Sequence, residues 1–390
     1  MTEKIIVEKF ITGGQTLGTL KDGKKIFFWN ALPEEIVIEY EITKQKSHFV
    51  EAIAKRIEQP SKHRAEPKDP CFLSTSPWQI MDFVCELKQK QKLVAESLRQ
   101  EHIDLTGLTI EPTRTDNREY FYRNKMEYAL YWNNDLGKIQ LAFHGRGTHG
   151  KFPVTQSSIE NPAIFQKAQT IVDELNVRHE EARKYQSLLL RANQKGEVSG
   201  GLFENKKPHP TFKNLEDTIL GQKYSYSPNG FFQINLPVYE LALQEIAKHI
   251  ETEKVLDLYA GVGTIGLSVA KDKDLTLVEV NGAAYQELKN NCKNTSAKPV
   301  LAKSEDALDY IAPDQTVILD PPRAGCDKKL IAKLLETTPE KLIYLSCNPS
   351  TQARDVKLLT EKYIIERIIP FNFFPKTPHI ENLIIMTRIK

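Results

Sequence analysis

Apolar and polar residues alternate with period two in the first sixty residues, in short runs separated by turn signals. The runs read IIVEKF, TLGTL, KIFFW, EEIVIEYEIT and HFVEAIAKRI, and turns are marked by Gly13-Gly14 and by KDGK at residues 21–24. Such alternation is typical of half-buried strands joined by hairpins. The pattern predicts a small β-barrel over residues 1–58, and the prolines of the next stretch predict a linker.

The middle of the chain, residues 59–225, mixes helical and strand patterns. Apolar residues recur with helical spacing from Trp78 to Glu101, and a second helix is expected from Pro162 to Glu181. Strands are expected at YRNKMEYALYW and KIQLAFH, before the turn-rich sequence PNGFFQIN. These patterns predict a central α+β unit, and its first helix, near residues 82–103, stands where it can pack on the unit that follows.

In residues 226–390 short apolar strands alternate with helical segments. The strands read KVLDLYA, LTLVEV, TVILD and KLIYLS. This repetition predicts an α/β, Rossmann-like, doubly wound and mostly parallel sheet. Ligands of such sheets bind at the carboxyl ends of the strands, so the residues that carry chemistry are expected there.

Composition places the chain among soluble globular proteins. Of the 390 residues 40% are hydrophobic and 27% charged, and no apolar run is long enough to span a membrane. The first ten residues lack the apolar core of a secretion signal. Five scattered cysteines, an odd number, argue against a disulfide framework and for a reducing compartment. We therefore expect a cytoplasmic protein with no membrane partner.

The net charge of +2 does not by itself indicate a nucleic-acid partner. By segment, residues 1–58 carry 9 basic and 9 acidic side chains, residues 59–225 carry 24 and 21, and residues 226–390 carry 20 and 21. Only the middle segment is basic. Any surface that binds RNA is therefore expected to be a local patch.

A strand runs into a glycine-bearing turn at VLDLYAGVGTIG, where Gly261, Gly263 and Gly266 have the spacing GxGxxG. Glycines let a backbone approach a ligand closely, although a tight turn without a ligand and a dinucleotide site remain alternatives. Glu279, at the end of the next strand, can accept the hydroxyls of a ribose or serve as a surface acid. Asp257 ahead of the turn favours a sulfonium cofactor, S-adenosylmethionine, over a pyrophosphate.

Two further strands end in motifs that carry reactive side chains: DPPR contains Asp320, and SCNP contains Cys347. A third motif, HIEN near the C-terminus, contains Glu381. Alone, the cysteine would be read as buried filler and Glu381 as a surface acid. Together they suit methylation of a pyrimidine carbon. Carbon 5 of uracil is a poor nucleophile until a thiolate adds to carbon 6. Cys347 is the expected thiolate, and Glu381 the expected base that removes the carbon 5 proton.

With these motifs the chain resembles the RNA uracil-5-methyltransferase family, whose members form 5-methyluridine in ribosomal and transfer RNA. GFFQIN, DLYAGVGTIGL, VEVN, LDPPRAG, YLSCNPST and HIEN occur in the family's order and span nearly the whole chain. The resemblance implies a class I methyltransferase domain, the nucleophile Cys347 and the proton acceptor Glu381. It also implies contacts to S-adenosylmethionine from Gln233, Tyr259, Thr264, Glu279 and Asp320.

Residues 1–58 resemble the OB-like barrel called TRAM, an RNA-binding module of ribosomal members of the family, through GGQTLGTLKDGKKIFFWNALPEEIVIEYEI. The resemblance favours ribosomal RNA, most of all 23S RNA, over transfer RNA as substrate. FYRNKMEY resembles the family's YRNKMEF. Its cations Arg118, Arg123 and Lys125 stand among aromatic residues and are the expected RNA contacts, unless the strand is an ordinary charged face.

Many ribosomal members hold an iron–sulfur cluster on four cysteines. Here Cys71 matches one ligand, residues 73–77 replace a cysteine pair, and Ser157 stands at the last ligand position. We therefore predict no cluster and no metal site.

Three other functions remain open from the sequence. An adenine amino-group methyltransferase also carries Asp-Pro-Pro, but an aromatic residue normally follows, where this chain has Arg323. A non-catalytic RNA-binding protein would be expected to lack Cys347 or Glu381. An oxidoreductase is disfavoured by Asp257. A monomer with no obligate protein partner is the default expectation.

Overall fold

The computed structural model describes residues 4–147, 150–205, 207–209 and 212–390. Its first five strands close into a barrel in the order β1-β2-β3-β5-β4. They are β1 (Ile5–Phe10), β2 (Thr16–Thr19), β3 (Lys25–Trp29), β4 (Ile36–Gln45) and β5 (Phe49–Gln59). Alternate residues of each strand fill the barrel, so Ile26 and Phe28 are buried while Trp29 faces outward. The predicted barrel is confirmed.

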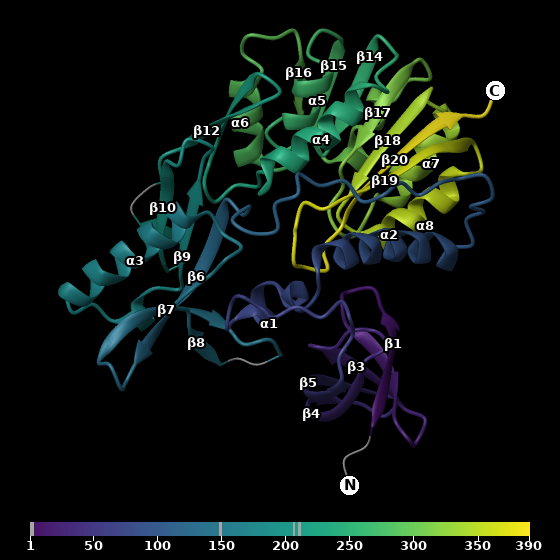
Figure 1. Cartoon of the computed structure of the whole chain (residues 1–390). Coiled ribbons are helices and arrows are strands. Elements are labelled where there is room, and N and C mark those ends of the chain that lie inside the picture. The colour runs from purple at the N-terminus through teal and green to yellow at the C-terminus, as the bar shows by residue number, and fades with distance from the viewer. Residues whose placement is uncertain (1–3, 148–149, 206, 210–211) are drawn as a thin grey trace.

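The linker runs into a short helix α1 (Phe72–Thr75), a 3-10 turn η1 (Pro77–Ile80) and the long helix α2 (Phe83–Gln100). The helical pattern expected from Trp78 is interrupted because Met81 is extended and Asp82 caps α2, accepting a hydrogen bond from the Cys85 amide at 2.7 Å. Figure 1 shows α2 lying between the barrel and the C-terminal sheet.

The central sheet is antiparallel, with six strands in the order β11-β10-β9-β6-β7-β8. Its strands are β6 (Lys125–Asn133), β7 (Lys138–His144), β8 (Lys151–Pro153), β9 (Ser187–Ala192), β10 (Val198–Glu204) and β11 (Lys207–His209). Helix α3 (Pro162–Val177) packs on it and ends before the expected Glu181, because His179 takes a left-handed conformation that stops the helix. A 3-10 turn η2 (Ala182–Lys184) follows.

The C-terminal sheet has seven strands in the order β16-β15-β14-β17-β18-β20-β19, the first five of which are parallel. The strands are β14 (Lys254–Leu258), β15 (Asp274–Glu279), β16 (Lys298–Leu301), β17 (Gln315–Leu319), β18 (Lys341–Ser346), β19 (Tyr363–Phe371) and β20 (Glu381–Arg388). The predicted doubly wound sheet is confirmed. The sequence patterns did not predict β16, β19 or β20, and β20 runs antiparallel to β18.

Helices cover both faces of this sheet. They are α4 (Leu236–Ala247), α5 (Thr264–Val269), α6 (Gly282–Asn291), α7 (Lys328–Thr337) and α8 (Pro349–Leu359), and 3-10 turns η3 (Ser304–Asp306) and η4 (Leu308–Tyr310) lie between β16 and β17. One apolar core joins α4, α5 and α6 to the sheet, and the other joins α7, α8 and α2.

Two elements of the predicted middle unit therefore pack on the C-terminal sheet. Besides α2, the hairpin β12 (Leu215–Ile219) and β13 (Gln222–Tyr226) contributes to the core of α4, α5 and α6. The unit limits at residues 58 and 225 remain a prediction. Within the described residues, no helix combines the length and the apolar character that crossing a membrane demands.

Candidate active site at the strand ends

The turn between β14 and α5 is shaped by two hydrogen bonds from backbone amides to carboxylates. The Gly261 amide donates to Glu279 Oε2 and the Gly266 amide to Asp257 Oδ2, each at 2.8 Å. A Cβ atom at Gly266 would lie 2.8 Å from that Asp257 oxygen, so glycine lets the helix approach the strand. A Cβ atom at Gly261 would point into open space. The outer side of the turn therefore has room for a ligand.

Glu279 is the last residue of β15 and is 8% exposed. Its second oxygen, Oε1, accepts from the Asn281 amide at 2.6 Å. Because each carboxylate oxygen has two lone pairs, both oxygens keep a site for a further donor. The geometry is compatible with the expected contact to ribose hydroxyls, which stays a prediction.

Asp257 lies inside β14 and is completely buried. Burial raises the pKa of this carboxyl to about 8, so it is largely protonated at neutral pH. Its Oδ2 holds α5 against the strand, and its Oδ1 has no hydrogen-bond partner among the described residues. The preference for a sulfonium cofactor therefore does not come from an exposed charge at Asp257, contrary to the argument from the sequence.

Of the other expected cofactor residues, Tyr259 and Thr264 belong to the same turn, and Gln233 comes from an earlier loop. Tyr259 follows β14 with a left-handed backbone (φ +65°), and Thr264, the first residue of α5, shares a hydrogen bond of 2.8 Å with the Tyr239 hydroxyl of α4. Gln233 is buried in the loop before α4, where its carbonyl accepts from Asn124 Nδ2 at 3.0 Å. Their roles toward a cofactor remain predictions.

Cys347 follows β18, and Asp320 follows the neighbouring parallel strand β17. Parallel strands in register end at the same edge, which brings the two residues together. Asn348 caps α8, and its Nδ2 donates to the Arg323 carbonyl at 2.9 Å. The turn that carries Cys347 is thereby fastened to the loop that carries Asp320.

Glu381 reaches this edge from a distant part of the chain. It is the first residue of β20, and the antiparallel register pairs Ser346 with Asn382. The beginning of β20 therefore lies beside the end of β18, next to Cys347. The carboxylate is 5% exposed and is not the surface acid of a tail loop.

The electrostatics of the strand ends favour protonated acids. Burial, with Glu381 and Asp320 nearby, raises the pKa of the Cys347 thiol to about 11, opposed by Arg323. Burial raises the pKa of Asp320 to about 7, and burial together with Asp320 raises that of Glu381 well above its usual range. A cationic ligand would offset these shifts, because an opposite charge favours the ionised acids. The sulfonium of S-adenosylmethionine fits such a site.

The loop between β19 and β20 is anchored by charges buried under it, which the sequence reasoning missed. Lys90 Nζ of α2 donates to Asn372 Oδ1 at 2.6 Å and to the Phe374 carbonyl at 3.0 Å, and it pairs with Glu86 at 3.1 Å. Glu86 also accepts from the Lys376 amide at 3.0 Å. Positions 86 and 90 are in phase with the apolar face of α2, the signal that could have revealed the network.

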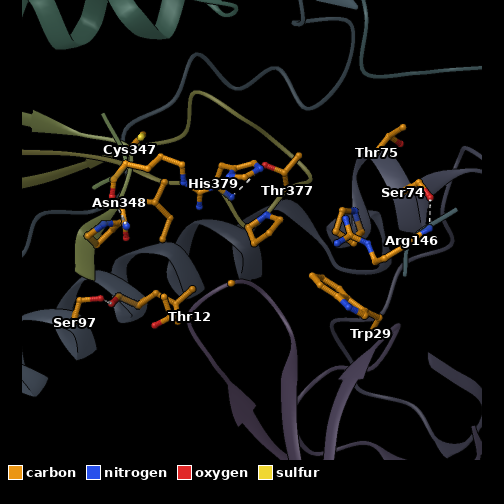
Figure 2. A pocket seen from close by; sticks show the side chains of 17 residues that line it. Thr12, Trp29, Ser74, Thr75, Ser97, Arg146, Cys347, Asn348, Thr377 and His379 are labelled. Carbon is orange, nitrogen blue, oxygen red and sulfur yellow. Dashed lines mark hydrogen bonds between the residues drawn. The ribbon is translucent and has the colours of Figure 1, made fainter. Parts of the chain in front are cut away.

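A cavity of about 270 Å³ extends from Cys347 toward the barrel. Figure 2 shows Cys347 and Asn348 at one end, and Trp29 and Arg146 at the other, with His379 between them. The barrel is fixed beside the cavity through Trp78, whose indole donates to the Gly14 carbonyl at 3.0 Å and whose amide donates to the Lys376 carbonyl at 3.0 Å. The sequence reasoning did not identify Trp29 or Arg146.

The expected RNA-binding cations do not line this cavity. Arg118 is exposed and paired with Asp116 at 2.5 Å, and Arg123 Nε donates to the Lys125 carbonyl at 2.9 Å. Lys125 Nζ donates to the carbonyls of Asn229 and Gly230, and burial lowers its pKa to about 8. Arg123 and Lys125 therefore take part in fixing the local chain, and their role toward RNA remains a prediction.

Cys71, the possible cluster ligand, is buried with its sulfur 3.7 Å from the Gln156 carbonyl oxygen. Burial raises the pKa of its thiol to about 11. Within the described residues, no three His, Cys, Asp or Glu side chains are grouped to hold a metal ion. The expected absence of a cluster remains a prediction.

Two family models match overlapping segments between residues 239 and 389. The model described as tRNA (Uracil-5-)-methyltransferase matches residues 304–389, which include Asp320, Cys347 and Glu381. The model described as methyltransferase small domain matches residues 239–343.

Similar proteins align over nearly the full length. An uncharacterized RNA methyltransferase of Lactiplantibacillus plantarum is 30% identical, over 96% of this chain and 95% of that protein. One of Bacillus anthracis is 27% identical, over 99% and 96%. The crystal structure of Pyrococcus abyssi tRNA (uracil-54, C5)-methyltransferase in complex with S-adenosyl-L-homocysteine has a TM-score of 0.76 at 22% identity and covers 99% of this chain and 100% of that one. This structural match shows that the whole fold is shared.

Proposed function

The chain belongs to the RNA uracil-5-methyltransferase family, and we propose that it forms 5-methyluridine in RNA with Cys347 as nucleophile and Glu381 as base. As a member of this family it is an S-adenosylmethionine-dependent enzyme. One observation supports these residue roles: the adjoining ends of β18, β17 and β20 bring Cys347, Asp320 and Glu381 close together.

The thiolate of Cys347 adds to carbon 6 of the uracil, and the electron pair of the C5–C6 bond moves onto carbon 5 and the adjoining carbonyl. Carbon 5 then takes the electrophilic methyl group that S-adenosylmethionine would supply, with S-adenosylhomocysteine as the leaving group. Glu381 removes the carbon 5 proton, the C5–C6 double bond re-forms, and the thiolate leaves. A carboxylate whose pKa burial has raised is a stronger base once it is ionised, which suits Glu381 to this step.

Five residues are proposed to hold the cofactor. Glu279 would accept hydrogen bonds from the ribose hydroxyls. Tyr259 and Thr264 would contact the adenosine beside the turn, and Gln233 would close the cofactor site on the side toward the central sheet. Asp320 would face the sulfonium side, where its charge also favours a cationic ligand. The support for this assignment is the open side of the turn at Gly261 and the cluster of acids beside it.

We propose 23S ribosomal RNA as the substrate, because the N-terminal barrel resembles TRAM. Transfer RNA is a second candidate with an observation in its favour. The Pyrococcus abyssi enzyme acts on transfer RNA and matches 99% of this chain, so a protein with this complete fold can act on transfer RNA. The expected working form is a monomer in the cytoplasm, which light scattering and cell fractionation would test.

The experiment uses total RNA from cells in which the gene for this chain is deleted, together with methyl-labelled S-adenosylmethionine. Nuclease digestion and nucleoside analysis should find labelled 5-methyluridine with the wild type and none with Cys347→Ala, whose cofactor binding should stay unchanged. The size of the labelled RNA decides between ribosomal and transfer RNA. Label on adenosine, or no label from a folded protein that binds RNA, would contradict the proposal.

A further inference from the structure

The cavity beside Cys347 extends away from the reactive strand ends, and its far end is built by other parts of the chain. Trp29 comes from β3 of the barrel, Ser74 and Thr75 come from α1, and Arg146 follows β7. Figure 2 shows these four residues at the end away from Cys347. Segments far apart in sequence thus enclose one space together with the reactive strand ends.

The lining of this cavity is positively charged although the molecule is nearly neutral. The positive charge comes from two arginines: Arg146 stands at the far end, and Arg323 lines the cavity close enough to Cys347 to favour its thiolate. His379, between them, is neutral at pH 7 because burial lowers its pKa to about 4. Among the described residues that line the cavity there is no Asp or Glu. The other polar lining groups are hydroxyls and one amide, at Thr12, Ser74, Thr75, Ser97, Thr377 and Asn348. This chemistry suits an anion with a sugar attached, as in a nucleotide.

Trp29 and Arg146 form an aromatic pair with a cation at the far end. The Arg146 guanidinium lies over the Trp29 ring, 4.1 Å from its centroid. The guanidinium is oriented by a hydrogen bond from Nε to the Leu73 carbonyl, and the Arg146 amide donates to Ser74 Oγ at 3.0 Å. Aromatic rings and guanidinium planes are the surfaces on which unpaired bases stack.

We propose that this end of the cavity binds an unpaired nucleotide that flanks the target uridine, with its base stacked on the Trp29–Arg146 pair and its phosphate drawn by Arg146. The inference rests on the proposed function, because a uridine can reach Cys347 only after it leaves its helical stack. The neighbours of such a uridine lose a stacking partner, which this pair replaces. The barrel thereby becomes part of the substrate site.

The test compares Trp29→Ala with Phe27→Ala. Phe27 is the matched control, because it points outward from the same strand, packs against Phe49 and does not line the cavity. With RNA from the deletion strain, Trp29→Ala should raise the KM for RNA roughly 5- to 100-fold, the effect of losing one base–aromatic stack. The kcat and the KM for S-adenosylmethionine should stay within about twofold of wild type.

Trp29→Phe keeps an aromatic face and should restore a KM for RNA near that of the wild type. A second readout needs no turnover: binding of a fluorescent single-stranded oligouridylate in the presence of S-adenosylhomocysteine should weaken in Trp29→Ala and not in Phe27→Ala. Arg146→Gln leaves the barrel sequence intact and should weaken the same binding. Melting temperatures check that each variant is folded.

The inference is overturned if Trp29→Ala and Arg146→Gln leave the KM and the oligouridylate affinity unchanged, or if Phe27→Ala has the effect of Trp29→Ala. In either case wild-type methylation persists, so the proposed function stands. A wild type that labels no RNA contradicts the proposed function instead.

Discussion

Cys347 is the one partly exposed cysteine of the five, all of which lie in the described part of the chain. Its surroundings nevertheless oppose ionisation, because burial and two carboxyl groups raise the pKa of the thiol to about 11. Reactive cysteines usually sit beside positive charge. Arg323 offsets this shift only in part, and we propose that the sulfonium of S-adenosylmethionine would supply further positive charge, so that cofactor binding activates the proposed nucleophile.

This activation can be measured by the rate of Cys347 alkylation as a function of pH. In the free protein the rate should rise toward a pKa of about 11. S-adenosylmethionine should shift the profile to lower pH, and S-adenosylhomocysteine, whose sulfur is neutral, should shift it less. Cys347→Ala gives the background from the buried cysteines. Equal shifts with both ligands would contradict the electrostatic explanation.

Glu381→Gln should separate the addition of Cys347 to the uracil from the later release of the methylated RNA. The amide cannot remove the carbon 5 proton, so we expect turnover to fall at least about 100-fold while a covalent protein–RNA adduct accumulates. Denaturing gels with labelled RNA detect the adduct. The double variant Cys347→Ala, Glu381→Gln is the control and should form none. Normal turnover in Glu381→Gln would assign the base to another group.

The raised pKa of Asp320 predicts that the stability of the cofactor-free protein depends on pH. Its pKa is raised to about 7 in the folded protein, so between pH 4 and 7 the folded state binds more protons than the unfolded state. The free energy of unfolding should therefore fall as pH rises through this window, by a few kcal/mol at most. Urea unfolding of Asp320→Asn at pH 5 and pH 8 should show a smaller fall than wild type. If the free energy of unfolding falls as much in Asp320→Asn as in wild type, other groups cause the pH dependence.

At the scale of elements, sequence patterns predicted the strands that bury apolar residues on both faces, such as LTLVEV and KLIYLS. They also predicted the turn with Gly261. The patterns did not predict strands whose place and direction in the sheet depend on the strand with which they pair. Nothing local in ENLIIMTR indicates that β20 runs antiparallel between β18 and β19, although this pairing places Glu381 at the site. The role of Glu381 was expected from the chemistry of the combined motifs and from the family resemblance, and not from periodicity.

The ion pair beneath the loop between β19 and β20 makes α2 part of the site's support. Lys90→Met removes the cation that holds Glu86, Asn372 and the Phe374 carbonyl. Breaking a buried pair costs roughly 3–5 kcal/mol, so we expect that loss in urea unfolding, with a lower kcat because the loop leads into Glu381. Lys92→Met, on the exposed face of α2, is the control. Equal effects in both variants would refute the role of the pair.

At the scale of the whole molecule, charge counts over segments could not predict the surface that we propose to bind RNA. The cavity takes Arg146 from the middle of the chain and Arg323 from the loop after β17, and residues of a barrel of zero net charge line it as well. The relative placement of the three parts is set by contacts such as those of Trp78, which leave no periodic signal in the sequence. Trp29 and Arg146 could therefore be found only in the structure, whereas Lys90 left a signal in its phase with the apolar face of α2.

RNA affinity should depend on few phosphates. Arg146→Gln and Arg323→Gln should each reduce the slope of log affinity against log salt by roughly 0.7 to 1. Titration of labelled RNA at several salt concentrations measures this slope. Arg183→Gln is the control, since that exposed arginine pairs with Glu181 away from the cavity. A slope that changes equally in all three variants would indicate diffuse binding.

The antiparallel pairing of β18 with β20 limits how this enzyme can vary during evolution. Cys347 and Glu381 are set relative to each other by a ladder in which Ser346 faces Asn382. Side chains alternate between the two faces of a strand, so inserting or deleting one residue in β20 would turn Glu381 to the opposite face. Exchanges of one apolar residue for another can accumulate along this strand, whereas a one-residue change of length within the paired part cannot.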